Sequence, residues 1–120
     1  MRLDHAMLFV KDLERMTAFY RDVMGLTPVE ATRMDDWVEF EGGAIHFALH
    51  AIPAEIAKDI HVPDPPRPRE QGSCRLTFTV DDLAATEARL VTLGVTLLHR
   101  PWGGWDAVDP EGNVLGIRQA

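Results

Sequence analysis

The side chains best suited to chemistry in this sequence are two histidines and one arginine at predicted strands. Successive side chains of a strand point to opposite faces, so in the segment 44–50 His46 points away from the apolar side chains. His5 is placed in the same way at the start of the strand 5–10, and Arg75 begins a similar segment later in the chain. Imidazole is the commonest metal ligand, and guanidinium binds carboxylate or phosphate through paired hydrogen bonds. The three side chains therefore indicate a polar, hollow surface that holds a metal or an anionic small molecule.

Each of these side chains also has a structural interpretation. His5 and His46 can line a cavity and hydrogen-bond each other, water or a ligand without any metal. Arg75 can pair with a carboxylate such as Glu39 or Glu41 instead of anchoring a ligand. The residue types alone do not separate these alternatives.

Aromatic residues cluster near the expected cavity mouth. Trp102 and Trp105 flank a glycine pair, and Trp37 begins the equivalent strand of the first half. Tryptophan at such places covers the core, forms a dimer contact or stacks on a ligand. The candidate substrate-binding residues are Arg75, Trp37, Trp102, Trp105, Thr77 and Phe9.

Other chemistries find no support in the sequence. A single cysteine, Cys74, excludes an internal disulfide and a cysteine-based zinc site, and we expect it to be a small buried hydrophobe. There is no glycine-rich phosphate loop and no nucleophile elbow. The catalytic residues therefore stay unknown at this level.

Composition describes an ordinary soluble domain of 120 residues, with 46% hydrophobic and 26% charged residues. A net charge of −7 without a basic cluster would repel a phosphate backbone, so we expect no nucleic-acid partner. No apolar run approaches the roughly 20 residues of a membrane helix, and the first residues do not resemble a signal peptide. These features predict a cytoplasmic protein without a membrane partner.

An internal repeat with an offset of 70 residues organises the chain. The segment 5–13 matches 75–83, and 43–47 matches 113–117. In each half an aspartate follows the strand and can cap a helix: Asp12 for a helix to about residue 24, and Asp82 for a helix over 83–93. Gly25 and Gly94 are suited to the position that ends them. Leu83, Leu90 and Leu93 are expected to face inward.

The halves are separated by the segment 53–72, which carries five of the eight prolines and should be irregular. A short helical turn is expected around 54–58. We interpret the chain as one domain: a first module over 1–52, this linker over 53–72, and a second module over 73–120.

Three segments resemble the vicinal oxygen chelate superfamily, which includes glyoxalase I, bleomycin-resistance proteins, fosfomycin-resistance enzymes and extradiol dioxygenases. They are MRLDHAML at 1–8, FYRDVMGL at 19–26 and DPEGN at 109–113. The resemblance implies an α+β fold in which two βαβββ modules form a curved mixed sheet around a cavity. It also implies pairing as a homodimer.

The resemblance further implies a divalent metal, Zn, Ni, Mn or Fe, held by side chains from the first and last strands of each module. The four corresponding residues are His5, His46, Arg75 and Gly116, and 41 residues separate each pair (46 − 5 and 116 − 75). Arginine has no lone pair to offer and glycine has no side chain, so only the two histidines are expected ligands. A catalytic site needs about three ligands, which His50, Glu39 or a neighbouring subunit would have to complete.

Three functions fit these features. The first is a glyoxalase-like enzyme, a metal-dependent lyase, isomerase or dioxygenase, acting on a small anionic or oxygen-rich molecule. The second is a non-catalytic drug-binding protein of the bleomycin-resistance type, which needs no metal. The third is a ferredoxin-like regulatory domain, which would lack the duplicated halves.

Overall fold

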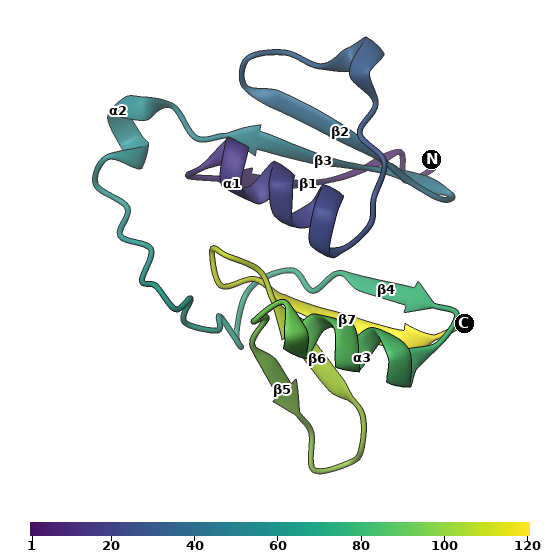
Figure 1. Ribbon diagram of the computed structural model, residues 1–120. Helices are drawn as coiled ribbons and strands as arrows, with labels where there is room; N and C mark the ends of the chain where they lie inside the picture. The colour runs from purple at the N-terminus through teal and green to yellow at the C-terminus, as the bar shows by residue number, and fades with distance from the viewer. The chain divides into compact units, whose positions relative to one another are not determined.

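Two mixed β-sheets, each with helices on it, form the fold in the computed structural model, which describes residues 1–120 (Figure 1). Internal contacts divide the chain into two units, 1–61 and 62–120. The first sheet has the strand order β1-β3-β2 and the second β4-β7-β6-β5. In each unit a strand is followed by a helix and then by antiparallel strands, and in the first unit a short helix comes after them. The predicted α+β class is confirmed.

The first unit holds seven elements. They are β1 (His5–Val10), α1 (Leu13–Ala18), η1 (Phe19–Val23), η2 (Glu30–Thr32), β2 (Trp37–Gly42), β3 (Ile45–Ala51) and α2 (Ala54–Ala57). The central strand, β3, runs parallel to β1 with His46 opposite His5 and antiparallel to β2 with His50 opposite Trp37. The short turn expected at 54–58 corresponds to α2.

The helix predicted from residue 13 to about 24 changes its winding midway. Asp12 caps α1, its carboxylate accepting from the Arg15 N–H at 3.0 Å, and Gly25 follows η1 with a φ of 75°. Between them η1 is a π-helix, in which the Met24 N–H donates to the Phe19 carbonyl. The wider turn buries both Phe19 and Tyr20, and such single turns are rare insertions in α-helices.

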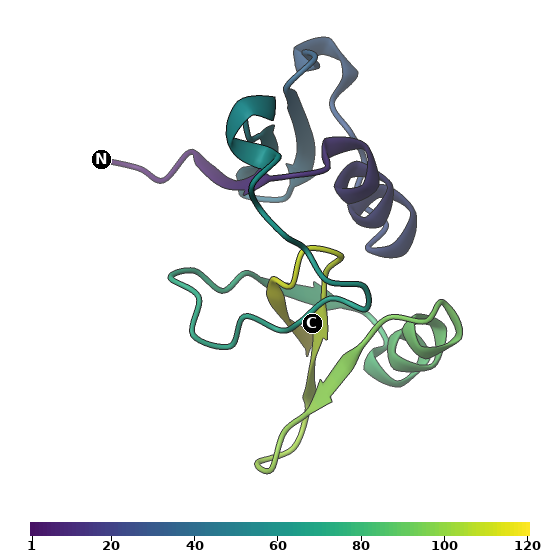
Figure 2. The ribbon, with the colours of Figure 1, turned by 90° about the vertical axis from the view of Figure 1, so that its left-hand side faces the viewer.

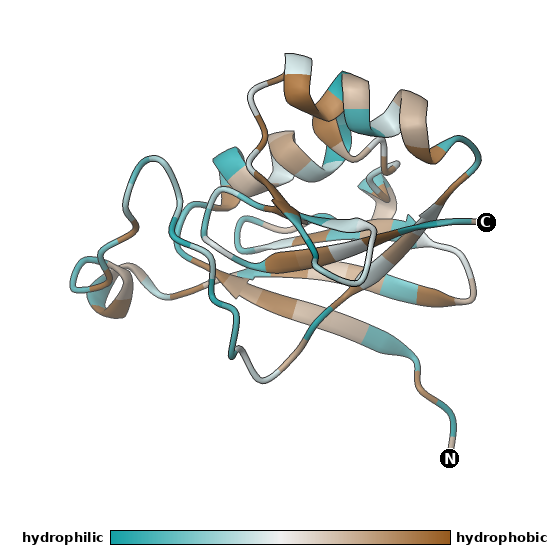
Figure 3. Ribbon diagram, turned by 90° about the horizontal axis from the view of Figure 1, so that it is seen from below, coloured by the Kyte–Doolittle hydropathy of each residue, from teal (hydrophilic) through white to brown (hydrophobic).

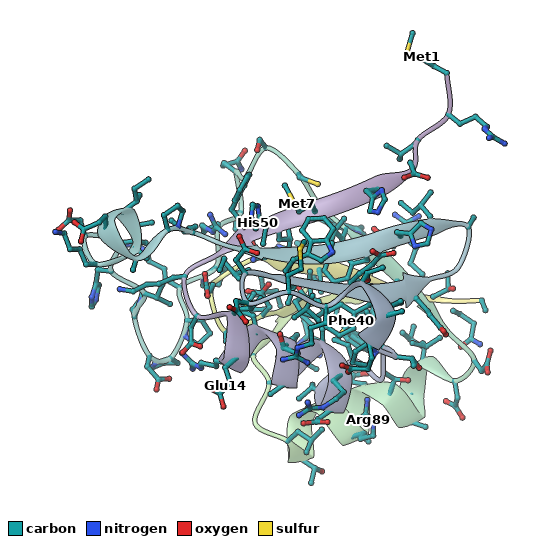
Figure 4. All side chains as sticks on the ribbon, turned by 90° about the horizontal axis from the view of Figure 1, so that it is seen from above. Met1, Met7, Glu14, Phe40, His50 and Arg89 are labelled. Carbon is teal, nitrogen blue, oxygen red and sulfur yellow. The ribbon has the colours of Figure 1, made fainter.

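The core of this unit is aromatic. The Tyr20 ring lies 4.9 Å from Phe47 and 6.3 Å from Phe40, within the range that edge and stacked ring pairs prefer. Tyr20, Phe40 and Phe47 are all buried. In Figure 4, Phe40 lies on the side of the sheet that faces α1, and Met7 and His50 lie on the other side. The predicted division of the sheet into a face packed on the helix and a face that carries the histidines is confirmed.

One strand of the expected βαβββ pattern is reduced to a single bridge. Pro28 pairs with Phe40 in isolation, supported by a Val29 N–H bond to the Glu39 carbonyl and a Glu41 N–H bond to the Thr27 carbonyl. Proline lacks the N–H that a ladder needs, so pairing does not extend.

The second unit holds β4 (Thr77–Val80), α3 (Leu83–Thr92), β5 (Leu97–His99), β6 (Trp105–Val108) and β7 (Val114–Gln119). The Asp82 carboxylate caps α3 through the Ala85 N–H, and Gly94 has a φ of 76°. Leu90 is buried, but the prediction that Leu93 faces inward is wrong, because it is the C-cap and 51% exposed.

The connection before β4 is irregular apart from α2, as its prolines predict. Figure 3 shows hydrophobic and hydrophilic residues alternating along the helices and hydrophobic runs in the strands. The expectation that Cys74 is buried is wrong: it is exposed, because β4 begins only at Thr77 and Cys74 still belongs to the connection. No helix combines the length and apolarity needed to cross a bilayer.

Candidate metal centre

Three potential metal ligands meet at one end of the first sheet. Nitrogens of His5 and His46 and a carboxylate oxygen of Glu39 all lie within 4.8 Å of one another. His46 Nδ1 is 2.5 Å from Glu39 Oε1, and His5 Nε2 is 3.9 Å from Glu39 Oε2. The two imidazole rings are stacked with centroids 5.0 Å apart. The prediction that the two histidines share one face is confirmed.

The parallel register of β1 and β3 creates this cluster. Since His5 lies directly opposite His46, both side chains leave the same face of the sheet. Glu39 reaches the same face from β2, where it lies opposite Ala48. Its neighbour there, Ala48, has only a small side chain.

Further side chains orient the cluster. The Asp4 carboxylate is 2.5 Å from His5 Nδ1, which orients the ring with Nε2 on the side of Glu39. The Thr32 hydroxyl donates to Glu39 Oε2 at 3.3 Å. Glu39 is only 7% exposed although it points away from the aromatic core. A buried carboxylate needs partners, and here its nearest ones are two imidazoles and a hydroxyl.

The donor set fits a divalent metal. Two neutral imidazoles and one carboxylate are the protein ligands of one group of catalytic zinc sites, which leave a fourth position for water or substrate. His5 and His46 are exposed, so that position would open to the outside of the first sheet. Of the residues that the sequence offered to complete the set, Glu39 is the one that lies beside the two histidines.

The face that carries the histidines continues beyond the cluster toward the other end of the strands, where it becomes apolar and aromatic. Along β1, Met7 and Phe9 are 39% and 59% exposed on the same face as His5. The Trp37 ring lies 6.1 Å from the His5 ring and 5.8 Å from the His50 ring, so it spans the middle of the face. Of the predicted substrate-binding residues, Trp37 and Phe9 therefore lie on the face that carries the ligands.

The second unit does not repeat this arrangement. Gly116 lies opposite Thr77 in β7 and β4, not opposite Arg75, so the equal spacing of 41 residues does not produce an equal register. A Cβ on Gly116 would lie 2.7 Å from the Thr77 hydroxyl, so a side chain there would have to displace Thr77. The sheet of the second unit therefore offers no ligand at this position.

Arg75 belongs to an ion-pair network within the second unit. Its guanidinium donates to the Glu70 carbonyl at 3.0 Å and lies 3.5 Å from the Asp106 carboxylate. Arg100 donates to Glu70 at 3.0 and 3.2 Å and to Asp106 at 2.6 and 2.9 Å. The expected pairing of Arg75 with Glu39 or Glu41 is not the one observed. That Arg75 shares a cavity with the two histidines stays a prediction.

This network makes stability depend on pH. Hydrogen bonds from Arg100 hold the pKa of the Glu70 carboxyl below its ordinary value of 4.5. A carboxyl whose pKa is lowered by folding stabilises the protein above the unfolded pKa, and this contribution disappears as the pH falls through the folded value. We expect Glu70→Gln to lower the thermal midpoint at pH 7, and the difference from wild type to shrink below pH 4.5.

Thermal unfolding followed by circular dichroism at a series of pH values measures this difference. Glu55→Gln is the control, because Glu55 forms only an exposed pair with Lys58 on α2 and such pairs contribute little. Equal midpoints for wild type and Glu70→Gln at pH 7 would contradict the assignment.

The remaining residues predicted to bind a substrate lie in the second unit. Trp102 is 80% exposed at the turn between β5 and β6, with the Arg100 guanidinium 5.9 Å from its ring centre. Trp105 is buried, and its indole N–H has no hydrogen-bond partner. Thr77 is exposed beside Gly116. Their contact with a substrate stays a prediction.

Sequence reasoning named Glu39 as one of several residues able to complete the site, but it missed Asp4 and Thr32. The position of Asp4, directly before a strand histidine, is a signal that could have been used. Thr32 lies on the turn η2, and only its hydrogen bond to Glu39 identifies it.

Known proteins resemble this chain over nearly its whole length. The family model described as Glyoxalase/Bleomycin resistance protein/Dioxygenase superfamily matches residues 2–117. A lactoylglutathione lyase from Agrobacterium tumefaciens is 25% identical, with a TM-score of 0.68 over 99% of this chain and 93% of that one. A protein of unknown function from A. tumefaciens str. C58 is also 25% identical, with a TM-score of 0.73 over 100% and 94%.

The fosfomycin resistance protein FosX from Mesorhizobium loti shares the fold at 21% identity, with a TM-score of 0.65 over 97% and 89% of the two chains. No curated protein matches the sequence.

Proposed function

Because the chain belongs to the Glyoxalase/Bleomycin resistance protein/Dioxygenase superfamily, we propose that it is a metal-dependent, glyoxalase-like enzyme for a small oxygen-rich substrate. The observation that carries this proposal is the His5–Glu39–His46 cluster. Two histidines alone would be too few for a catalytic metal, whereas two histidines and a carboxylate form a complete set with an open position.

In this proposal His5 and His46 bind the metal as neutral imidazoles, and Glu39 supplies a negative charge that offsets part of the metal's charge. Asp4 keeps the His5 proton on Nδ1, which leaves Nε2 free to bind. Thr32 fixes one Glu39 oxygen. A divalent ion held there would act as a Lewis acid that binds substrate oxygens and stabilises negative charge developing on them.

The cluster also supplies a proton acceptor. Glu39 has two carboxylate oxygens, and one of them can bind metal while the other faces the Thr32 hydroxyl. A buried carboxylate beside the substrate can take a proton from carbon or oxygen, which is the chemistry of lyases and isomerases of this kind. Trp37 would cover one side of the site and limit its contact with water.

Metal analysis of the purified wild-type protein tests the proposal. We expect uptake of close to one equivalent of Zn²⁺, Ni²⁺, Mn²⁺ or Fe²⁺ per chain after dialysis, measured by mass spectrometry of the metal content. We expect turnover of a chelating substrate, such as the hemithioacetal of an α-keto aldehyde and a thiol, only in the metal-loaded protein. A wild-type protein that takes up none of the four metals would rule the proposal out.

The ligand set of the second unit favours a second candidate, a non-catalytic binding protein of the bleomycin-resistance type. There Gly116 offers no ligand side chain, and the Asp106 carboxylate is held by Arg75 and Arg100. A ligand that quenches tryptophan fluorescence and is recovered unchanged from metal-loaded protein would support this candidate.

We also propose that both units form one domain over residues 1–120, with modules 1–52 and 73–120 and a linker over 53–72, and that two chains pair as a homodimer. The boundary between the compact units, at residues 61 and 62, falls inside that linker. Sedimentation equilibrium of the full chain would measure the oligomeric state.

A further inference from the structure

Five rings form a continuous row along the face of the first sheet that carries His5 and His46. Their centroid separations are 5.0 Å from His46 to His5, 6.1 Å from His5 to Trp37, 5.8 Å from Trp37 to His50, and 5.4 Å from His50 to Phe9. Each separation lies in the range in which aromatic rings interact. The row therefore connects the metal cluster at one end of the strands with Phe9 at the other.

A groove of about 770 Å³ opens where the row ends. Its apolar lining comes from Phe9, Ala51, Ile52, Pro53, Ala54 and Ala57. The helix α2 forms one wall, and Figure 2 shows it in teal across the ends of β1 and β3. The volume is within the usual range for small-molecule sites.

The charged residues that line the groove already have partners. The Lys11 ammonium donates to the Ile60 carbonyl, and Lys58 donates to Glu55 at 2.9 Å. Asp36 lies 3.3 Å from His50 Nε2. An entering charged group would have to compete with these contacts, whereas an uncharged apolar group would cover only the exposed apolar surface.

Among the residues that line the groove, Phe9 is the large apolar side chain that is exposed. It is 59% exposed, although large apolar side chains at strand positions are normally covered. It lies four positions after His5, which at a rise of about 3.3 Å per residue is a distance of roughly 13 Å. A molecule held by its oxygens at the metal would need to cover most of that distance to reach Phe9.

From this arrangement we infer that the natural substrate carries an uncharged aromatic tail, which extends from the metal cluster along Trp37 and His50 into the groove beside α2. The inference rests on the proposed function, because the oxygen-bearing head of the substrate is placed at His5, Glu39 and His46. It restricts the substrate class to chelating molecules with an aryl group separated from the chelating oxygens by a short chain.

Two hydroxamates test the inference, because a hydroxamate binds a metal through two neighbouring oxygens. Acetohydroxamate carries the head alone, and 4-phenylbutyrohydroxamate adds an aryl tail on a short chain. Isothermal titration of the zinc-loaded protein would give both dissociation constants. Covering a phenyl ring with apolar surface favours binding, so we expect the aryl compound to bind about 10- to 100-fold more tightly.

Phe9→Ala should remove most of this gain, and the ratio of the two dissociation constants is the quantity to compare. Ile56→Ala is the matched control, because Ile56 is 58% exposed on α2 but does not line the groove; its ratio should equal that of wild type. Two outcomes would overturn this inference but leave the proposed function standing. They are equal affinities for the two hydroxamates in wild type, or a tighter binding of the aryl compound that survives Phe9→Ala. Failure of acetohydroxamate to bind zinc-loaded protein would overturn the proposed function together with it.

Discussion

The Glu39→Gln protein is expected to bind Zn²⁺ more than about 100-fold more weakly than wild type. Outer-shell partners of metal ligands contribute roughly 10- to 100-fold to affinity, so loss of a ligand's negative charge should cost at least the upper end of that range. The change keeps the shape of the side chain, and the amide can still accept from the Thr32 hydroxyl. Competition titration with a chromophoric chelator would measure the dissociation constant.

The double variant His5→Ala, His46→Ala is expected to lose binding altogether, because Glu39 would then be the only ligand left in the cluster. Two controls match these changes. Glu14→Gln removes the same charge from an exposed position on α1, away from the cluster, and His61→Ala, His99→Ala removes two imidazoles elsewhere. Wild-type affinity in Glu39→Gln would show that Glu39 is not a ligand, and equal losses in a variant and its control would show a non-specific effect.

The Asp109→Ala protein is expected to be less stable than wild type by about 2–4 kcal/mol. Asp109 is fully buried, and its carboxylate accepts from the Glu111 N–H at 3.0 Å, the Asn113 N–H at 2.9 Å and the Asn113 amide at 2.6 Å. These bonds shape the turn between β6 and β7. Alanine would leave the donors without their acceptor. A buried donor without a partner costs more free energy than a hydrogen bond contributes to stability.

Urea unfolding followed by circular dichroism would measure the free energy of unfolding. Asp81→Ala is the control, since Asp81 is an exposed aspartate of the same unit and surface changes of this kind have effects within about 0.5 kcal/mol. A difference between Asp109→Ala and Asp81→Ala below about 1 kcal/mol would contradict the structural role assigned to the turn.

The position of this turn illustrates what local chemistry decides. Asp109, Pro110 and Gly112 are turn residues for reasons internal to the chain, and Gly112 indeed has a φ of 90°. The same holds for the caps: Asp12 and Asp82 each accept from the N–H three residues later, as their types predict. Signals of this kind span only a few residues, so the sequence was enough to predict them.

The register between strands that are far apart in the sequence is not decided by local signals. The repeat predicts the same pairing in both units, and in the first unit His5 does lie opposite His46. In the second unit Thr77 takes the place expected for Arg75, and β4 begins two residues later than the repeat predicts. A two-residue shift keeps every side chain on its face, so alternation in the sequence cannot detect it.

By itself, the sequence determined the fold class, the two helices with their caps, the proline-rich connection and the common face of His5 and His46, because each depends on periodicity or on contacts within a few residues. Only the tertiary structure decided that Glu39 joins the two histidines, that Arg75 is held by Glu70 and Asp106, and that a row of rings leads from the cluster to a groove at α2. These contacts join separate strands and loops, and their geometry depends on how the strands pair and the rings pack.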